Sequence, residues 1–148
     1  RHTYRICEWD GEFREYVEAL NTHKPTIICG DFNVAYHDID VEKPKEYRNV
    51  CAGFLDNERA NFHKLLAGGW IDSFREFYPE AEEMYTFWDQ KIPAKRKKNR
   101  GWRIDYFLVP RALRRQIHCA DIHPHIMGSD HCPISLEFEP QRRLKIVR

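Results

Sequence analysis

The sequence has 148 residues, of which 42% are hydrophobic and 32% are charged, a balance typical of one globular domain with a sizeable core. Its formal net charge of +1 excludes a strong overall attraction to nucleic acids or membranes, so any such attraction must be local. No apolar run reaches the roughly 18 residues of a membrane-spanning helix, and no signal-peptide pattern precedes the first predicted helix.

The cysteines predict an intracellular protein with reduced thiols. Their number is odd and no C-x-x-C motif occurs, which argues against a disulfide framework. They are Cys7, Cys29, Cys51, Cys119 and Cys132. Because the chain opens with Arg1 in the middle of a structural pattern, we expect an N-terminal portion of its domain to lie outside this sequence.

The first half of the chain predicts two helices, one buried strand and a long loop. Residues 8–21 place apolar side chains at helical spacing, and residues 56–69 do so between an N-cap candidate, Asp56, and a Gly-Gly stop. The short apolar run 26–29 follows a proline and leads into a glycine, which is typical of a buried strand. Residues 35–55 are polar and contain proline and glycine, so we expect a loop there.

The second half is richer in predicted strands. Residues 70–80 indicate a short helix or turn that ends at a proline. Strands are predicted at 84–89, 102–110, 117–124 and 133–139, with a basic loop at 91–101, a helical turn at 111–116 and a basic tail at 141–148. Strands mixed with helices and long loops favour a layered α/β architecture, with residues 1–140 as one structural unit.

Polar residues at three strand ends carry the candidate chemistry. Asp31 and Asn33 follow the first strand and share one face if the extended conformation continues. Asp105 lies inside an apolar strand, where a carboxylate costs free energy unless it is paired. Asp130 and His131 precede the last strand. Three separate segments thus bring acids, an amide and an imidazole toward what we expect to be one edge of a sheet.

Each of these segments also has a purely structural interpretation. The first pair can be turn residues after Gly30, Asp105 can pair with Arg103, and residues 128–131 can form a solvated turn. The joint interpretation is chemically more specific, because a histidine is a natural partner for a buried aspartate and the pair fixes the imidazole tautomer. Spare carboxylate oxygens suit Mg²⁺ better than Zn²⁺.

Six motifs in order give the sequence a family resemblance, which runs from about residue 4 to residue 139. They are "GDFNV", "AGF", "IDSFR", "YTFW", "GWRIDYFLV" and "GSDHCP". In this order and spacing the sequence resembles the exonuclease III-type apurinic/apyrimidinic (AP) endonucleases, within the endonuclease/exonuclease/phosphatase superfamily. The resemblance implies a DNase I-like α/β sandwich of two sheets, mixed or antiparallel and flanked by helices, of which this chain would be the C-terminal half.

The resemblance also implies roles for the polar residues. Asp31 matches the acid that orients or deprotonates the attacking water, and Asn33 matches the amide that holds the scissile phosphate. His131 matches the histidine that contacts the phosphate, and Asp105 matches its orienting partner. Asp130 matches a metal-site carboxylate, with Asp31 and Asn33 beside the metal. The implied cofactor is Mg²⁺, with Mn²⁺ as a substitute.

Further matches concern the DNA substrate. Phe87, Trp102 and Ile104 match an apolar pocket that receives a flipped abasic sugar, and Arg96 and Asn99 lie in a loop that approaches the DNA backbone. Residues 95–103 hold six lysines or arginines in nine residues, which suits phosphate contacts but also suits a solvated surface loop. The implied partner is duplex DNA with abasic sites, and no membrane is expected to be a partner.

The implied reaction is Mg²⁺-dependent hydrolysis of the phosphodiester 5′ to an abasic site, in base excision repair, in a nucleus or a bacterial cytoplasm. The family's first half, with its principal metal-binding glutamate, has no counterpart here, so we expect this chain alone to be inactive and the missing N-terminal half to be a partner. Two alternatives stay open: a related phosphatase or non-specific DNase, which Phe87 and Trp102 argue against, and a non-catalytic DNA- or partner-binding module.

Overall fold

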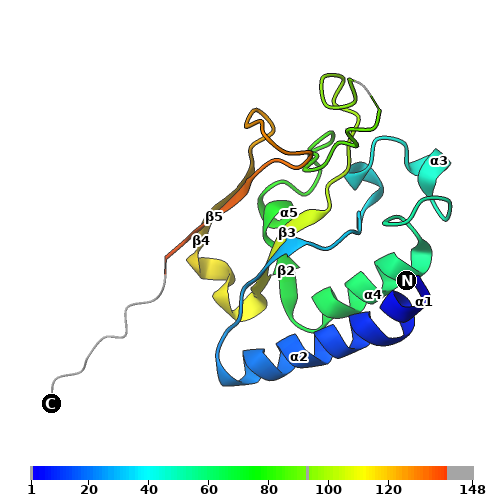
Figure 1. Ribbon diagram of the computed structural model, residues 1–148. Helices are drawn as coiled ribbons and strands as arrows, with labels where there is room; N and C mark the ends of the chain where they lie inside the picture. Colours follow the sequence, from blue (N-terminus) through cyan, green and yellow to red (C-terminus); the bar gives the residue numbers. More distant parts are fainter. Residues whose placement is uncertain (1, 93, 140–148) are drawn as a thin grey trace, which may run out of the picture.

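Helices and antiparallel strands are mixed along the chain in the computed structural model, which describes residues 2–92 and 94–139 (Figure 1). The mixed α/β class expected from the sequence is confirmed. The predicted basic tail, 141–148, lies outside the described residues. Within the described ranges, no helix is both long enough and apolar enough to cross a membrane.

The chain begins with continuous helical structure. Helix α1 (His2–Tyr4), a π-helical turn (Arg5–Trp9) and α2 (Asp10–His23) follow one another, so the helix predicted at 8–21 is confirmed and extends in both directions. Helix α4 (Asp56–Ala67) runs beside α2 (Figure 1). Its N-cap is Leu55 rather than the predicted Asp56, because the Glu58 carboxylate accepts hydrogen bonds from the backbone N–H groups of Gly53 (2.6 Å) and Leu55 (3.1 Å).

A three-stranded antiparallel sheet forms the centre of the structure. Strand β3 (Asp105–Pro110) lies between β1 (Ile28–Asp31) and β2 (Trp70–Asp72), in the order β1-β3-β2. The prediction placed β1 two residues too early, so Asp31 is the last residue of the strand rather than a residue after it. In the register of β1 against β3, Asp31 lies directly opposite Asp105. The sheet itself therefore brings two candidate acids together.

A second sheet is the antiparallel pair β4 (Ile117–Ile122) and β5 (Ile134–Phe138). Both strands confirm the predictions at 117–124 and 133–139 with shorter ends, and the 3₁₀-helix Arg111–Gln116 confirms the helical turn before β4. Residues 70–80 contain β2 followed by α5 (Ser73–Phe77), of which only the short helix was predicted. Helix α5 contacts both β3 and β4 and so joins the two sheets.

The strand predicted at 84–89 is wrong. This segment makes only isolated bridges, between Phe87 and each of Trp102 and His131. The hydroxyl of Thr86 accepts the backbone N–H groups of Ile104 and Asp105, which takes these donors out of a regular ladder. The loop predicted at 35–55 contains a 3₁₀-helix (Asp38–Asp40) and α3 (Pro44–Tyr47).

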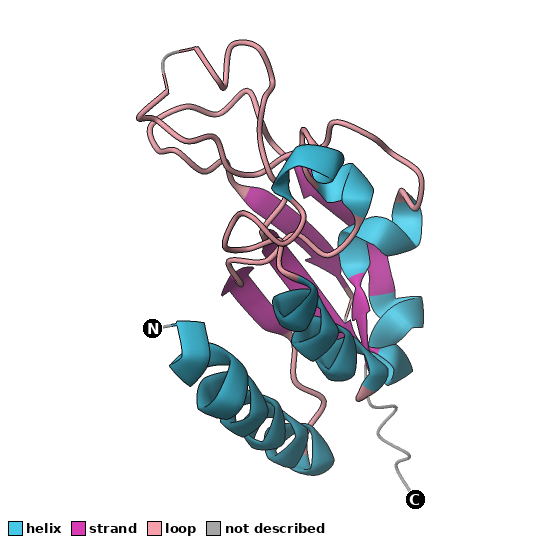
Figure 2. Ribbon diagram, turned by 90° about the vertical axis from the view of Figure 1, so that its right-hand side faces the viewer, coloured by secondary structure: helices cyan, strands magenta, loops and turns pink. Residues whose placement is uncertain are grey.

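Helices α2 and α4 cover one face of the three-stranded sheet (Figure 2). The side chains buried between them are Val17, Val34, Phe62, Leu65, Trp70, Tyr106 and Leu108. Each large apolar side chain buried in this way contributes about 2 kcal/mol to folding. A separate cluster of Ala35, Val41, Phe54 and Ile104 supports the loops above the sheet. Because the chemistry-bearing residues sit on these loops and on the strand ends, the core holds their backbone in place.

Candidate active site

The acid at the start of β3 and the histidine before β5 form a hydrogen-bonded pair. His131 Nδ1 lies 2.8 Å from Asp105 Oδ2, and both side chains are partly buried. A carboxylate accepts at this distance, so Nδ1 carries the proton and Nε2 is left to face a ligand. The alternative prediction that Asp105 pairs with Arg103 is wrong, because Arg103 pairs with Asp40 and Asp72 instead.

Asp31 and Asn33 meet through a tight turn. The Asp31 carboxylate accepts hydrogen bonds from the Asn33 backbone N–H (2.7 Å) and side-chain amide (2.9 Å). Asn33 has a positive φ of 50°, so the continued extended conformation, on which the shared face of Asp31 and Asn33 was conditional, is not present. The two side chains nevertheless come together, because an Asx-type turn folds the amide back onto the acid.

The protein surroundings make the carboxylate of Asp31 easier to protonate than that of an ordinary aspartate. Partial burial raises the pKa of its carboxyl from the ordinary value of 3.8, and the negative charge of Asp105 raises it further. The hydrogen bond from Asn33 and the positive charges of His131 and Arg5 oppose this rise without cancelling it. A carboxylate with a raised pKa is a better proton acceptor, which suits a group that handles the proton of an attacking water.

Arg5 supports this turn and carried no signal in the sequence. Its guanidinium donates to the backbone carbonyls of Phe32 (2.7 Å) and Asn33 (3.0 Å). It also lies 3.6 Å from the carboxylate of Asp10 and 3.8 Å from that of Glu58. Arg5 thereby ties the N-terminal helical segment to the strand end. Sequence reasoning could not find these hydrogen bonds, because Arg5 is 27 residues from Phe32 and 28 residues from Asn33.

The Asp130 carboxylate bonds within its own loop. It accepts a hydrogen bond from the hydroxyl of Ser129 (3.2 Å). Across residues 2–92 and 94–139, no group of three or more His, Cys, Asp or Glu side chains is placed to hold a metal ion. Metal binding by Asp31, Asn33 and Asp130 stays a prediction.

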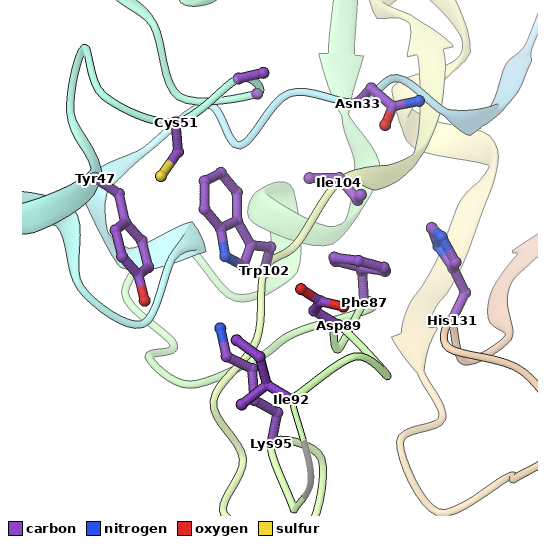
Figure 3. A pocket seen from close by; sticks show the side chains of 12 residues that line it. Asn33, Tyr47, Cys51, Phe87, Asp89, Ile92, Lys95, Trp102, Ile104 and His131 are labelled. Carbon is purple, nitrogen blue, oxygen red and sulfur yellow. The ribbon is translucent and has the colours of Figure 1, made fainter.

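A largely apolar cavity of about 390 Å³ opens beside His131 (Figure 3). The predicted pocket residues Phe87, Trp102 and Ile104 all line it, together with Asn33 and His131. The Phe87 ring lies 5.0 Å from that of His131, so the apolar wall continues directly into the polar corner. The structure thus brings five of the candidate residues to one cavity.

One glycine makes this wall possible. A Cβ atom at Gly101 would lie 2.6 Å from the carbonyl oxygen of Phe87 and 2.7 Å from the Trp88 indole nitrogen. Only glycine allows the segments that carry Phe87 and Trp102 to approach this closely. A glycine is therefore required on steric grounds before Trp102 in the "GWRID" motif.

Arg96 and Asn99 make contacts within the protein. The Arg96 guanidinium donates to the backbone carbonyls of Ser129 (2.7 Å), Pro124 (3.0 Å) and Ile126 (2.6 Å). The Asn99 side chain donates to the carbonyl of Glu83 (2.9 Å) and accepts from the Trp88 indole (3.3 Å). Both residues join the basic loop to neighbouring loops in this structure. Their contact with DNA stays a prediction.

Comparison with known proteins decides the family. The sequence pattern of the Endonuclease/Exonuclease/phosphatase family matches residues 1–131. The chain belongs to this family. Within it, the chain is 46% identical over 136 residues to an exodeoxyribonuclease of Bacillus subtilis (strain 168), a match that covers 92% of this chain and 53% of that protein.

A second relative and a solved structure identify the branch. The chain is 47% identical over 137 residues to a DNA-(apurinic or apyrimidinic site) endonuclease of Dictyostelium discoideum, covering 92% of this chain and 37% of that protein. The crystal structure of AP endonuclease LMAP from Leishmania major matches with a TM-score of 0.84 and 34% identity, over 95% of this chain and 46% of that one. The resemblance to AP endonucleases and their α/β fold is confirmed, and the chain spans about half or less of these relatives' length.

Proposed function

We propose that this chain is the phosphate- and sugar-binding part of a DNA-repair nuclease that hydrolyses the phosphodiester 5′ to an abasic site in duplex DNA. One observation carries the proposal: Asn33 and His131 line the same cavity as Phe87, Trp102 and Ile104. Polar donors and an apolar wall therefore meet at one cavity. Such a combination suits a phosphate attached to a sugar that has lost its base.

The chain's own groups have distinct roles in this proposal. When both ring nitrogens of His131 are protonated, its Nε2–H and the amide of Asn33 are donors for phosphate oxygens, which gain charge in the transition state. Asp105 holds the imidazole in the required orientation. Asp31, with its raised pKa, accepts a proton from water. The apolar wall excludes an intact nucleotide by shape, so a baseless sugar is the selected ligand.

A further part of the domain is needed to complete the site. Among the described strands, β1 pairs only with β3, so its other edge carries unpaired backbone groups. Beside this edge lies a groove of about 470 Å³, lined by Tyr4, Trp9 and Phe13 among others, with the first two 53% and 45% exposed. We propose that the N-terminal half of the domain covers this groove and adds the metal ligands that the described residues lack.

The proposed metal is Mg²⁺, with Mn²⁺ as a substitute. When bound, such an ion supplies positive charge to the phosphate and to the leaving oxygen. Asp31, Asn33 and Asp130 are this chain's contribution to its ligands. The proposed setting is base excision repair in a nucleus or a bacterial cytoplasm.

An incision assay on duplex DNA with one abasic site tests the proposal. We expect cleavage 5′ to the site by the full-length protein with Mg²⁺, loss of cleavage on addition of a chelator, and loss with His131→Ala. We expect no cleavage by residues 1–148 alone. Cleavage by this chain alone that Asp31→Ala abolishes would contradict the requirement for a second half.

The same assay separates the alternatives. A non-specific DNase would cut intact and abasic duplexes at similar rates. A non-catalytic binding module would bind DNA in a salt-dependent manner without any Mg²⁺-dependent cleavage, even in the full-length protein. Preference for the abasic duplex by a factor of at least about 100 is the outcome that supports the repair nuclease.

A further inference from the structure

Tyr47 lies flat against the pocket residue Trp102. The ring centroids of Tyr47 and Trp102 are 5.5 Å apart and their planes differ by 16°, so the two rings are stacked. Phe54 meets the same indole edge-on, at 6.1 Å and 83°. The orientation of the Trp102 ring is thus determined from two directions by other aromatic side chains. In Figure 3, Tyr47 is on one side of the indole, while Ile104, Phe87 and His131 are on the other.

A charged pair holds Tyr47 in this position. The Tyr47 hydroxyl donates to Glu42 Oε1 (3.3 Å), and the same oxygen accepts from Lys95 Nζ (2.7 Å). The Lys95 ammonium also lies 5.9 Å from the centre of the Tyr47 ring. These three side chains come from two segments, residues 42–47 and the basic loop, that are far apart in the sequence.

The ion pair of Glu42 and Lys95 is largely shielded from water, and the backbone of Glu42 is bonded to the pocket wall. The side chain of Glu42 is 6% exposed and that of Lys95 is 14% exposed. Burial opposes the charged form of Lys95, yet its hydrogen bond and charge attraction to Glu42 raise its pKa, so the ammonium persists at neutral pH. The Glu42 backbone N–H donates to the Gly101 carbonyl (3.1 Å), next to Trp102.

We propose that Tyr47 is a positioning residue that sets the substrate selectivity of the pocket by bracing Trp102, and that Glu42 and Lys95 hold Tyr47 in place. This inference rests on the proposed function, because it concerns what the pocket admits. Tyr47 also lines the cavity, but in this proposal it acts on the sugar through the indole on which it is stacked. It keeps the indole from turning away from the cavity, and the cavity thereby stays too narrow in one direction for a sugar that still carries its base.

The consequence is a specific change in kinetics. Without the Tyr47 ring, the indole can rotate and the wall recedes, so an intact nucleotide enters more readily and a baseless sugar is held less tightly. His131 lies across the cavity from Tyr47 (Figure 3), so the chemical step for a bound abasic site stays close to normal. Selectivity and KM change, whereas kcat for the abasic substrate changes little.

The first test measures incision of abasic and intact duplexes by the full-length protein and three variants. Tyr47→Ala is expected to raise KM for the abasic duplex about tenfold, with kcat within about twofold, and to lower the abasic-to-intact preference about tenfold. Tyr47→Phe retains the ring and is expected to restore most of the selectivity. Glu42→Gln is expected to give an intermediate loss.

Glu46→Gln is the matched control for Glu42→Gln. It removes a carboxylate from an exposed pair with Lys43, in the same part of the chain, where the Glu46 side chain is 61% exposed. This variant is expected to keep wild-type selectivity. The proposal is overturned if Tyr47→Ala keeps wild-type KM and selectivity, or if Tyr47→Phe is as defective as Tyr47→Ala.

A second test needs no activity and so separates this inference from the proposed function. In full-length protein labelled with 5-fluorotryptophan, Trp102→Phe identifies the ¹⁹F resonance of Trp102. We expect Tyr47→Ala to move this resonance and Tyr47→Phe to leave it nearly unchanged. If wild-type protein does not incise abasic DNA but this pattern is seen, the proposed function fails while the brace stands. An unmoved resonance in Tyr47→Ala overturns the brace itself.

Discussion

His131 and Asp105 are joined by a hydrogen bond of 2.8 Å between Nδ1 and Oδ2, although 26 residues separate them in the chain. Phe87 bridges both Trp102, three residues before Asp105, and His131, and so holds the two segments together. The pair directs the second imidazole nitrogen toward the cavity, where a phosphate oxygen is proposed to bind.

Asp105→Asn tests the orienting role of this pair. The amide can no longer attract the Nδ1 proton as a carboxylate does, so the imidazole loses its preferred tautomer. We expect kcat of the full-length protein to fall about 100-fold with little change in KM. Single-turnover incision of an abasic duplex measures this. Asp121→Asn on β4 is the control and should retain wild-type activity, whereas normal turnover by Asp105→Asn would rule out the orienting role.

The raised pKa of Asp31 can be measured in the metal-free protein. Burial raises the pKa of its carboxyl above 3.8, so the carboxylate is lost at a higher pH than for an ordinary aspartate. We expect a midpoint above 3.8 when the Asp31 side-chain resonance is followed by NMR on acidification without Mg²⁺. A midpoint at or below 3.8 would contradict the raised pKa. Because Asp31 is accessible to solvent, we expect the displacement to be modest.

The same carboxyl predicts a dependence of stability on pH. Because the pKa of Asp31 is raised on folding, there is a pH range above 3.8 in which the folded state keeps the proton and the unfolded state has released it. The contribution of Asp31 to the free energy of unfolding therefore falls as pH rises from 3.8 through the higher folded-state pKa. Asp31→Asn should therefore unfold at a higher urea concentration than wild type at pH 7 and lose this advantage near pH 3. If Asp31→Asn were more stable than wild type by the same amount at both pH values, the gain would have a cause other than the raised pKa.

Arg103 is the centre of a buried ion network. Its guanidinium is 2.7 Å from Asp40 Oδ1 and 2.6 Å from Asp72 Oδ2, and Arg75 contacts the same Asp40 oxygen at 2.5 Å. Arg103→Met leaves two carboxylates buried without this partner, which costs about 3–5 kcal/mol. Urea unfolding of the full-length protein measures the loss. Arg114→Met, at an arginine whose side chain is 54% exposed, is the control and should cost less than about 1 kcal/mol.

This network also responds to acid. Burial of Asp40 opposes its charged form, but Arg103 and Arg75 prevail and lower the pKa of the carboxyl below 3.8. Stability from this group is therefore complete above 3.8 and is lost as pH falls through the lower folded-state value. Asp40→Asn should lower the free energy of unfolding at pH 7 and show a weaker decline below pH 3.8 than wild type.

Neighbouring basic residues of the loop 91–101 are expected to have different roles, in DNA binding and in stability. Lys97 and Lys98 are exposed, whereas the Arg96 guanidinium is bound to three carbonyls of residues 124–129. Lys97→Ala and Lys98→Ala should each weaken binding of duplex DNA and reduce the slope of log K against log salt by about one. Arg96→Ala should lower thermal stability instead. Fluorescence anisotropy over a salt series separates these effects, and an unchanged slope in the double lysine variant would place the DNA elsewhere.

Local patterns predicted much of the fold because they depend on neighbours in the chain. The helix at 56–67 follows from apolar spacing and its glycine stop, and the alternation at 134–138 follows from one buried face of a strand. The segment 84–89 looked equally strand-like but makes only isolated bridges, because Thr86 takes donors that a ladder would use. Such competition is a tertiary property and leaves no periodic signal.

The chemical groups of this protein and its family could be read from the order of its motifs, within which Asp31, Asn33, Asp105 and His131 stand. The partners of these groups depend on the folded arrangement. Arg103 bonds to Asp40 and Asp72 rather than to its neighbour Asp105, and Tyr47 stacks on Trp102 although their residue numbers differ by 55. A buried charge is stable only beside an opposite charge, and rings stack only where the fold brings them together. These distances in space cannot be read from spacing along the chain.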